Sequence, residues 1–543
     1  MSRSRLLHPL RGIRRDLHRR APWLKSDFID GFTFRTLPTT IRILSINLLP
    51  ALAFELDLLR HSGGYFGISE ALFSSALAAL VFSLFSCQPL TIVGITGLIS
   101  LFNATVYEIL RTLEVGMLYP QFMGWVALWA AAMHIAVAVG NLCDYMRYVT
   151  DFSTHTFGMY VGVIYVIKGF GELVALFREG DATASWCGVF VAGGFWGLVA
   201  FLEGVRGTCL GTEGVRKAIA DFAYPIATIW WTGFSYIPGV RGVGVERLPL
   251  ARAFKPTVER NWVVEFWELP VKWVFVAMPM GVLLTLLFYY DHNVSSLTAQ
   301  AKGFPLRKPA GFHWDFFLLG ITCLIAGVFG LPLPNGLVPQ APVHTDACTE
   351  YEDCLVQALS RPLPDDYGRD TSSEIVNTKV TKATRVHEQR ISHLAMGLCF
   401  IVFMTGLFLR LLHFIPRAVF AGVFLVVGWG SISSMNITDN LLFVFTETRF
   451  ISPSDPRLEL KRLRILYYTA WQVVGVVACV AISQTIAAIG FPVIITALIP
   501  LRWVVLPKVF SERELEVLDS LTADADVVLE SLGGRPGENN RNV

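Results

Sequence analysis

The sequence predicts an all-α polytopic membrane protein with 14 transmembrane segments, arranged as a 7+7 inverted repeat. Of its 543 residues, 53% are hydrophobic and only 16% are charged, whereas a soluble protein carries roughly 25% charged residues. The apolar residues form blocks of about 20, the length of a helix that crosses roughly 30 Å of hydrocarbon. This composition argues against a soluble multidomain enzyme.

Residues 1–26 form a basic segment before the first apolar block. It holds eight basic residues and one acidic residue, a net charge of +7. We expect this segment to remain in the cytoplasm as an anchor, because basic residues are retained on the inner side of a membrane. A nucleic-acid-binding arm is the alternative, and the adjoining membrane span argues against it.

Twelve apolar blocks are clear candidates for membrane spans. They lie at about 36–57, 68–86, 119–140, 155–178, 184–202, 217–237, 270–291, 314–331, 391–413, 416–435, 466–485 and 486–503. We therefore expect a first repeat over residues 27–237, a loop over 238–269 and a second repeat over 270–505.

Two further apolar segments, 88–104 and 331–346, are short and interrupted. Prolines 332, 334 and 339 exclude a regular helix through the second segment. Non-helical backbone at membrane depth is tolerated only where protein covers it or where it lines a polar cavity. Each segment lies third in its half of the chain, and such a pair indicates the binding site of a transporter. The count becomes seven plus seven, and an odd number per repeat requires the two halves to have opposite orientations.

Loop charges favour a topology with both termini in the cytoplasm. The loops 292–313 and 449–464 carry an excess of basic residues and would lie inside. The 238–269 loop would lie outside despite five basic residues, which speaks mildly against this topology. We expect the polar loop 347–390 to be cytoplasmic and partly without regular structure. The acidic tail 506–543 is expected to be cytoplasmic, with its residues 511–530 packing on the inner face of the protein.

The cysteines indicate neither a disulfide framework nor a metal site. Nine is an odd number, and no metal-type pair of closely spaced cysteines occurs. We expect buried thiols in or beside apolar blocks at Cys87, Cys143, Cys187, Cys209, Cys323, Cys399 and Cys479. No cofactor is expected.

Several long motifs occur in order between residues of about 20 and 505. They are Gln88 to Gly97, Asp291-His292-Asn293-Val294-Ser295-Ser296, Leu306 to Asp315, Glu388 to Ser392 and Thr485 to Pro492. Together they resemble the bicarbonate transporter (anion exchanger) superfamily, and the run from Leu331 to Thr345 resembles its boron transporter branch in fungi and plants. The resemblance implies a core domain of spans 1–4 and 8–11, a gate domain of spans 5–7 and 12–14, an elevator motion, and a homodimer through the gate domain.

The interrupted segments supply most of the candidate substrate ligands. A helix that begins inside the membrane leaves backbone amides unpaired and directs its positive dipole end at the cavity. An anion is the natural occupant of such a position. We expect the site to include the following residues of these segments and of the first span: Thr91, Thr96, Gly97, Asn335, Gly336 and Asn47.

Asp291 and Gln340 decide what the site binds. Asp291 ends an apolar block, and a helix continuing to Ala301 would place its carboxylate within the protein. Taken alone it is more often an interfacial residue, but the resemblance implies a carboxylate that contacts substrate or carries a coupled proton. In the resemblance to the superfamily, Gln340 occupies the position at which chloride/bicarbonate exchangers have an arginine. Its amide both donates and accepts hydrogen bonds, which favours hydroxyl-rich borate, and capping of local backbone is the alternative.

These observations predict a secondary transporter that exports borate or boric acid between the two interrupted segments. We expect the plasma membrane as its location, with the vacuolar membrane as the alternative. Bicarbonate or another small inorganic anion is the alternative substrate, and a transport-inactive receptor or scaffold and a channel are alternatives of other classes. The sequence contains no phosphate-binding loop and no hydrolase motif, so an ATP-driven pump or an enzyme is unsupported.

Overall fold

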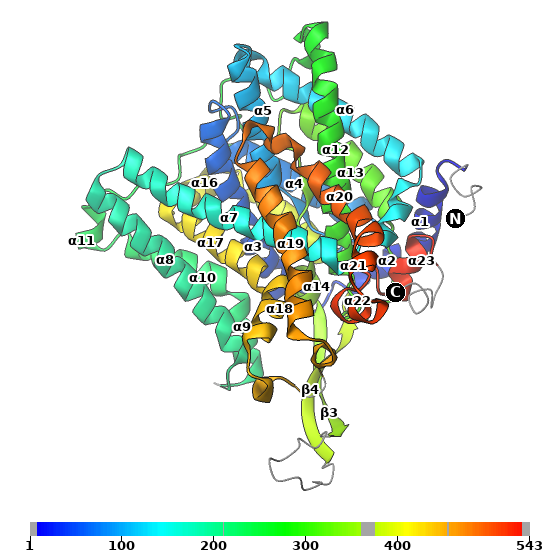
Figure 1. Ribbon diagram of the computed structural model, residues 1–543. Coiled ribbons are helices and arrows are strands. Elements are labelled where there is room, and N and C mark those ends of the chain that lie inside the picture. Colours follow the sequence, from blue (N-terminus) through cyan, green and yellow to red (C-terminus); the bar gives the residue numbers. More distant parts are fainter. Residues whose placement is uncertain (1–7, 210, 360–374, 453–454, 535–543) are drawn as a thin grey trace.

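The computed structural model describes residues 8–209, 211–359, 375–452 and 455–534. In this part of the chain, eight helices are long and apolar enough to cross a membrane, and two bent helix pairs could raise the number to ten. The eight include α3 (Thr36–His61), α4 (Ile68–Phe85), α6 (Tyr119–Val139), α7 (Asp151–Glu179), α8 (Ala182–Gly204), α12 (Val271–Ala299), α19 (Arg462–Ser483) and α20 (Phe491–Val504). The structure is thus a helical, multi-pass architecture (Figure 1), and the count of 14 spans stays a prediction.

Some expected spans are broken rather than straight. The pairs α15 (Ile391–Phe403) with α16 (Gly406–His413) and α17 (Arg417–Ser433) with α18 (Asn436–Phe445) bend by 86° and 64°. The block expected at 217–237 divides into α9 (Glu213–Asp221) and α10 (Ala223–Phe234). Pro225 lies in the first turn of α10, where its missing N–H is tolerated, whereas a continuous helix would lose a hydrogen bond there.

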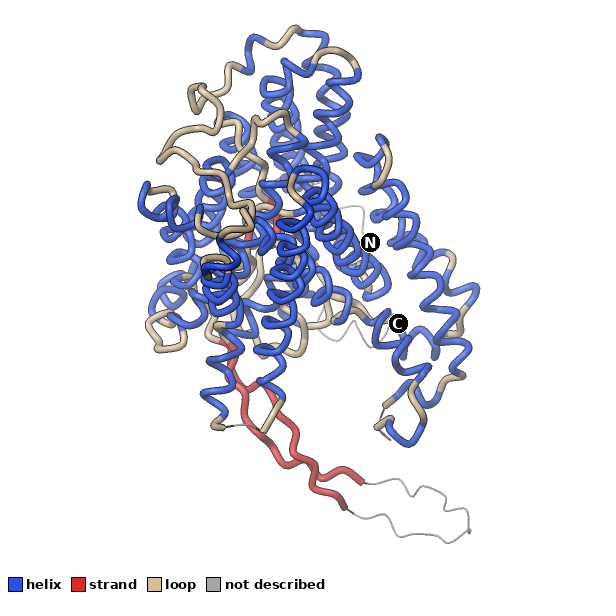
Figure 2. The backbone as a smooth tube through the Cα atoms, turned by 90° about the vertical axis from the view of Figure 1, so that its left-hand side faces the viewer, coloured by secondary structure: helices blue, strands red, loops and turns tan. Residues whose placement is uncertain are grey.

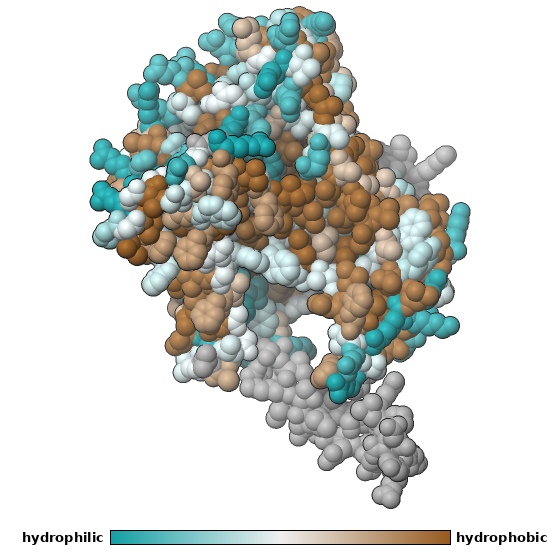
Figure 3. All heavy atoms as spheres, turned by 60° about the vertical axis from the view of Figure 1, so that its left-hand side comes forward, coloured by the Kyte–Doolittle hydropathy of each residue, from teal (hydrophilic) through white to brown (hydrophobic). Residues whose placement is uncertain are grey.

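Large apolar side chains are exposed on the outer helices. Trp186, Phe190 and Phe201 of α8 are 64%, 59% and 67% exposed, and Ile229 and Trp230 of α10 are 74% and 65% exposed. Figure 3 shows hydrophobic side chains in a broad band across one face. Such a surface is unfavourable in water and favourable against lipid.

The helices pack in two groups. In the first group, α12 and α13 (Phe312–Val328) lie on α6, and α15 lies on α3 and α4. In the second group, α17 lies on α7 and α8, α19 lies on α7, and α10 lies on α8. The groups meet where α17 contacts α3 and where α20 contacts α12.

The two interrupted segments lie within the first group and meet each other. The first holds the short strand β1 (Val93–Gly94) and then helix α5 (Gly97–Thr112). The second holds β2 (Asn335–Gly336) and then helix α14 (Gln340–Ala347). The strands pair antiparallel, with Val93 opposite Gly336 and Gly94 opposite Asn335. The prediction that both segments leave the helical conformation is confirmed.

The expectation of a purely α-helical chain is wrong in one larger element. The loop expected at 347–390 contains an antiparallel hairpin of β3 (Thr349–Leu359) and β4 (Ile375–Val386), which projects from the helical body (Figure 2). β4 is rich in valine and threonine, whose branched side chains favour extended backbone. Residues 360–374 of this loop lie outside the described residues.

The terminal segments are folded and touch each other. The basic segment forms α1 (Arg11–Arg20) and α2 (Leu24–Ile29), and the tail forms α22 (Glu512–Leu518) and α23 (Asp526–Ser531). Arg19 pairs with Glu530 at 2.8 Å, and Arg15 donates to the carbonyl of Ser531. The expectation that the tail packs on the protein is confirmed; residues 1–7 and 535–543 lie outside the described residues.

The cysteines differ in part from expectation. Cys87, Cys143, Cys323 and Cys479 are buried, as expected, and Cys187 and Cys399 are half-buried. Cys209 is exposed, so its predicted burial is wrong. It lies between α8 and α9, beyond the end of the apolar block that suggested burial.

Candidate functional site

The β1–β2 pair places the beginnings of two helices close together in the protein interior. Helix α5 begins at Gly97, and Thr96 caps it by accepting a hydrogen bond from the Ile99 N–H at 3.3 Å. Helix α14 begins at Gln340. Helix α5 begins three residues after the end of β1 and α14 begins four residues after the end of β2, so their positive dipole ends lie near the same region.

A small cavity lies beside the strand pair. It measures ≈ 10 Å³, enough for about one water-sized sphere. Residues of α3, α4, α15 and both interrupted segments line it: Asn47, Pro50, Ala51, Ser75, Val93, Gly94, Ile95, Leu337, Gln340, Met396 and Phe400.

Three side-chain oxygens around this cavity are buried and accept or donate no hydrogen bond within the described chain. They are Asn47 Oδ1, Ser75 Oγ and Gln340 Oε1. The Asn47 Nδ2 donates to the Ile43 carbonyl at 2.6 Å, which leaves the Asn47 oxygen as the atom without a partner. Buried polar groups are nearly always hydrogen-bonded in native proteins. Three such oxygens on one cavity therefore indicate a place for a ligand that donates hydrogen bonds.

Asp291 lies behind this cavity rather than on its wall. It is buried in α12, and its Oδ2 accepts a hydrogen bond from Asn335 Nδ2 at 2.7 Å. Asn335 in turn pairs through its backbone with Gly94, which lines the cavity. Asp291 thus supports the strand pair through Asn335.

The other expected ligands surround the site without lining the cavity. Gly336 lies so close to α12 that an added Cβ would stand 2.8 Å from the Cα of His292. Gly97 is similarly enclosed, with Tyr165 and Phe54 at 2.5 Å and 2.7 Å from such an atom. Thr91 is buried and its hydroxyl makes no hydrogen bond in the described part of the chain. Of the eight expected ligands, Asn47 and Gln340 line the cavity.

Ser75 and His344 were missed as site residues by the sequence argument. Ser75 follows Ser74, whose hydroxyl donates to the Pro332 carbonyl at 2.6 Å. This pair of serines inside an apolar block was the available signal. His344 lies one turn after Gln340; its Nδ1 is 2.9 Å from the Leu90 carbonyl, and its Nε2 is 2.7 Å from the Ser392 hydroxyl. His344 therefore joins α14 to the first interrupted segment and to α15, and nothing in the sequence revealed those partners.

A larger cleft adjoins the same site. It measures ≈ 360 Å³, and Gln340 lines it as well as the small cavity. Its walls come from α3, α12 and α14 of the first group and from α7, α8, α9, α10 and α17. The cleft thus lies between the two groups of helices, and Gln340 stands between the cleft and the small cavity.

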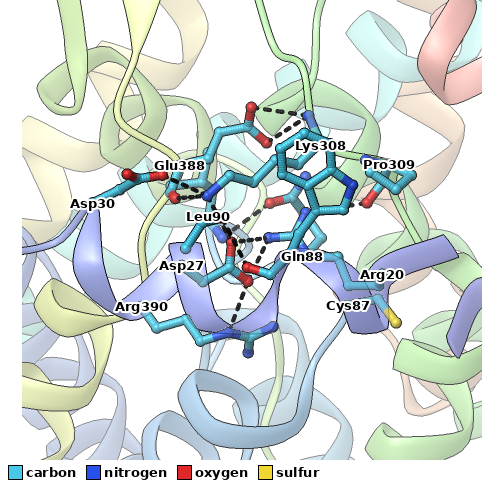
Figure 4. A network of polar contacts seen from close by, with 12 residues as sticks. Arg20, Asp27, Asp30, Cys87, Gln88, Leu90, Lys308, Pro309, Glu388 and Arg390 are labelled. Carbon is cyan, nitrogen blue, oxygen red and sulfur yellow. Dashed lines mark hydrogen bonds and ion pairs between the residues drawn. The ribbon is translucent and has the colours of Figure 1, made fainter. Parts of the chain in front are cut away.

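A buried charge network fixes the start of the first interrupted segment (Figure 4). Asp27 accepts hydrogen bonds from Arg20 at 2.7 Å, Lys308 at 2.9 Å and Arg390 at 3.0 Å. Arg390 also donates to the carbonyls of Ser83 and Ser86, at the end of α4. The network joins the terminal segment to α4, to the loop before α13 and to the beginning of α15.

Two further carboxylates hold the backbone around this network. Asp315 accepts from the backbone N–H groups of Cys87 and Gln88 at 2.5 Å and 2.9 Å. Glu388 accepts from the N–H groups of Arg307 and Lys308. Burial raises the pKa of Glu388, and these amide donors act in the opposite direction.

The comparisons with known proteins agree with this architecture. The protein family described as "HCO3- transporter integral membrane domain" matches this chain over residues 8–185, 179–361 and 369–523. The chain belongs to the bicarbonate transporter family.

This family consists of membrane transporters, and the chain is therefore a membrane transporter and not an enzyme. It is 40% identical over 506 residues to a Schizosaccharomyces pombe protein, covering 93% of this chain and 94% of that protein. It is 35% identical over 521 residues to Boron transporter 1 of Saccharomyces cerevisiae, covering 94% of this chain and 85% of that protein. The transmembrane domain of the cyanobacterial bicarbonate transporter BicA has the same fold, with a TM-score of 0.53 at 15% identity over 84% of this chain and 98% of that one.

Proposed function

We propose that this bicarbonate transporter family member exports borate or boric acid, which binds between the beginnings of α5 and α14. The observation that carries the proposal is the set of three unpartnered oxygens on one cavity, from Asn47, Ser75 and Gln340. Borate presents four hydroxyl groups on a tetrahedral centre and can donate to several acceptors at once. The resemblance to Boron transporter 1 of Saccharomyces cerevisiae supports the same substrate class.

Charge supports an anionic or hydroxyl-rich load. The two helix beginnings contribute positive dipole ends, while the amide of Gln340 leaves no fixed positive charge at the start of α14. Asp291 supplies an ionisable group that supports the strand pair through Asn335. In the proposed cycle, Asp291 exchanges a proton as the substrate enters and leaves.

The small cavity requires a conformational change for loading. Its ≈ 10 Å³ accommodates far less than a tetrahedral oxyanion. We propose that the first group of helices is the core domain of a 14-span inverted repeat and moves as an elevator against the second group, the gate domain. The gate would also form the homodimer interface, the membrane would be the plasma membrane, and both termini would be cytoplasmic.

Bicarbonate is the second candidate substrate, because the family description names it. Bicarbonate has a single hydroxyl donor, so it would leave one of the two amide oxygens of Asn47 and Gln340 without a partner, whereas the Ser75 hydroxyl could donate to it. An unsatisfied buried acceptor is unfavourable by about 1–3 kcal/mol. On this ground the cavity favours the boron ligand.

The experiment is reconstitution in liposomes with separate boron, bicarbonate and pH readouts. The unmodified protein should show saturable boron flux, because a carrier moves one bound load per cycle. Asp291→Asn retains an oxygen that can accept from Asn335 but removes the ionisable group, so boron flux should be lost while the dimer still assembles. Glu447→Gln, at an exposed carboxylate, is the matched control. Unchanged boron flux in Asp291→Asn would remove Asp291 from the mechanism, and bicarbonate flux without boron flux would establish the second candidate.

A further inference from the structure

Four charged side chains connect the two groups of helices at one end of the cleft. Arg42 of α3 and Asp346 of α14 come from the first group. Arg206, directly after α8, and Asp221, at the end of α9, lie on the side of the second group. The Arg42–Asp221 distance is 3.1 Å, the Arg206–Asp346 distance is 3.0 Å, and the Arg42–Asp346 distance is 3.3 Å. Two of these three ion pairs therefore cross from one group to the other.

These residues lie where the cleft meets a second cavity. Arg42 and Asp221 line the ≈ 360 Å³ cleft that reaches Gln340, and they also line an outer cavity of ≈ 370 Å³. Arg206 and Asp346 line the outer cavity as well. The Arg42–Asp221 pair thus stands on the boundary between the route to the substrate site and the outer cavity.

The setting makes these pairs stronger than ordinary surface pairs. The side chains of Arg42, Asp221 and Asp346 are only 18%, 25% and 23% exposed, and that of Arg206 is 37% exposed. Partly buried pairs are less screened by water and salt than exposed ones. Tyr351 also donates to the second carboxylate oxygen of Asp346 at 2.7 Å, which holds that carboxylate in place.

We propose that Arg42, Asp221, Arg206 and Asp346 form an ion-pair latch that holds the two groups of helices together at this mouth of the cleft. The latch has two positive and two negative charges, so its closed state leaves no net charge at the mouth. If the first group moves against the second, the crossing pairs must break and form again in every cycle. When they are broken, Arg42 loses Asp221 and keeps its pair with Asp346 in the first group, so its guanidinium has donors available for an entering anion at the boundary of the cleft. The latch rests on the proposed function for its role in transport, but its existence as a constraint on cleft opening is testable without transport.

The test measures access to the cleft with a hydrophilic maleimide on protein purified in detergent, where both sides are accessible to the reagent. Val343 lines the cleft, and Val343→Cys provides the reporter thiol. Cys209→Ser forms the background, because Cys209 is exposed and would react itself. Arg42→Gln and Asp221→Asn should each raise the labelling rate roughly two- to fivefold, as expected for loss of an ion pair of modest strength. The double variant should not exceed Arg42→Gln, since both changes remove the same pair.

Arg35→Gln is the matched control. Arg35 lines the same outer cavity, but its ion pair with Glu350 at 3.9 Å and its hydrogen bond to the Thr349 carbonyl at 2.8 Å stay within the first group, because both partners directly follow α14. Its labelling rate should equal that of the background protein. Unchanged labelling in Arg42→Gln and Asp221→Asn, or an equal increase in Arg35→Gln, would overturn the latch, provided that thermal melting shows all variants folded.

Boron flux in the same variants separates the latch from the proposed function. Increased labelling with altered boron flux supports both proposals. Increased labelling in a protein that transports no boron at all would retain the latch and refute the boron assignment. Unchanged labelling in a protein with saturable boron flux would refute the latch and retain the boron assignment.

Discussion

Replacing Gly336 with alanine tests whether the close contact of β2 with α12 positions the substrate site. An added Cβ would stand 2.8 Å from the Cα of His292 and 3.0 Å from the Cβ of Ser295. The first of these atoms belongs to the backbone of a 29-residue helix and cannot rotate away. The strand must therefore move, and with it the pairing of Gly336 with Val93.

The expected size of the effect follows from the cost of overpacking. Inserting a methyl group into a well-packed interior destabilises a protein by about 1–3 kcal/mol. If the strain caused by the added methyl group must be overcome to reach the loaded state, it weakens boron binding. A strain of about 1.4 kcal/mol reduces the boron affinity tenfold. Gly336→Ala should thus lower the thermal melting temperature and lower the boron flux at subsaturating concentrations by about tenfold.

Gly94→Ala is the control on the opposite strand. Its Cβ would meet only Leu337 Cδ1, at 3.3 Å, and that atom ends a flexible side chain. The melting temperature should therefore remain close to that of the unmodified protein. Because Gly94 and Leu337 both line the small cavity, boron flux should fall without loss of stability. Normal stability and normal flux in Gly336→Ala would refute the argument that this contact positions the site.

Two further predictions concern the terminal segments. Asp27→Asn should lower the melting temperature strongly, because it removes the anion shared by three buried cations. Breaking a buried ion pair costs about 3–5 kcal/mol. The control Arg252→Gln, in an exposed pair, should change the melting temperature little, and equal effects of the two variants would contradict the structural role of Asp27. Burial raises the pKa of Asp524 from its ordinary 3.8 to about 6 in the docked tail. Between these pH values, the docked tail therefore keeps a proton that a released tail has lost. Docking of the tail weakens as the pH rises through this window. Hydrogen exchange of residues 519–534, corrected for intrinsic rates, should be slower at pH 5 than at pH 7, and Asp524→Asn should reduce this difference; an unchanged difference would exclude Asp524 as its source.

Much of the site's position could be predicted from the sequence. Pro332, Pro334 and Pro339 exclude a helix, and the membrane requires that such backbone be covered by protein. These two facts located the second interrupted segment, and the short, interrupted apolar run at the matching place in the first half, 88–104, located the first. Their direct pairing could not be derived, because it depends on how two stretches more than 200 residues apart pack in space.

The role of Asp291 shows the limit of that reasoning. The sequence placed its carboxylate inside the protein, and the structure agrees. Its hydrogen bond to Asn335 and its position behind the small cavity depend on the pairing of β1 with β2. Ser75, in contrast, lies on the cavity wall, although its sequence context is an ordinary apolar helix.

The terminal segments were interpreted too simply from charge alone. The basic segment suggested a cytoplasmic anchor, whereas Arg20 and Asp27 are buried in a network within the protein. The pairing of Arg19 with Glu530 explains part of the charge asymmetry between the two ends. Charge counts identify such segments, but only the folded chain shows which opposite charges they meet.

A density map of the protein in lipid with saturating borate tests the central claim most directly. The account predicts added density for one tetrahedral ligand within hydrogen-bonding distance of the Asn47, Ser75 and Gln340 side chains, and none there in Gln340→Ala prepared in the same way. Density at another place in the protein, or a borate-saturated map in which these three oxygens bond only to protein atoms, would contradict it.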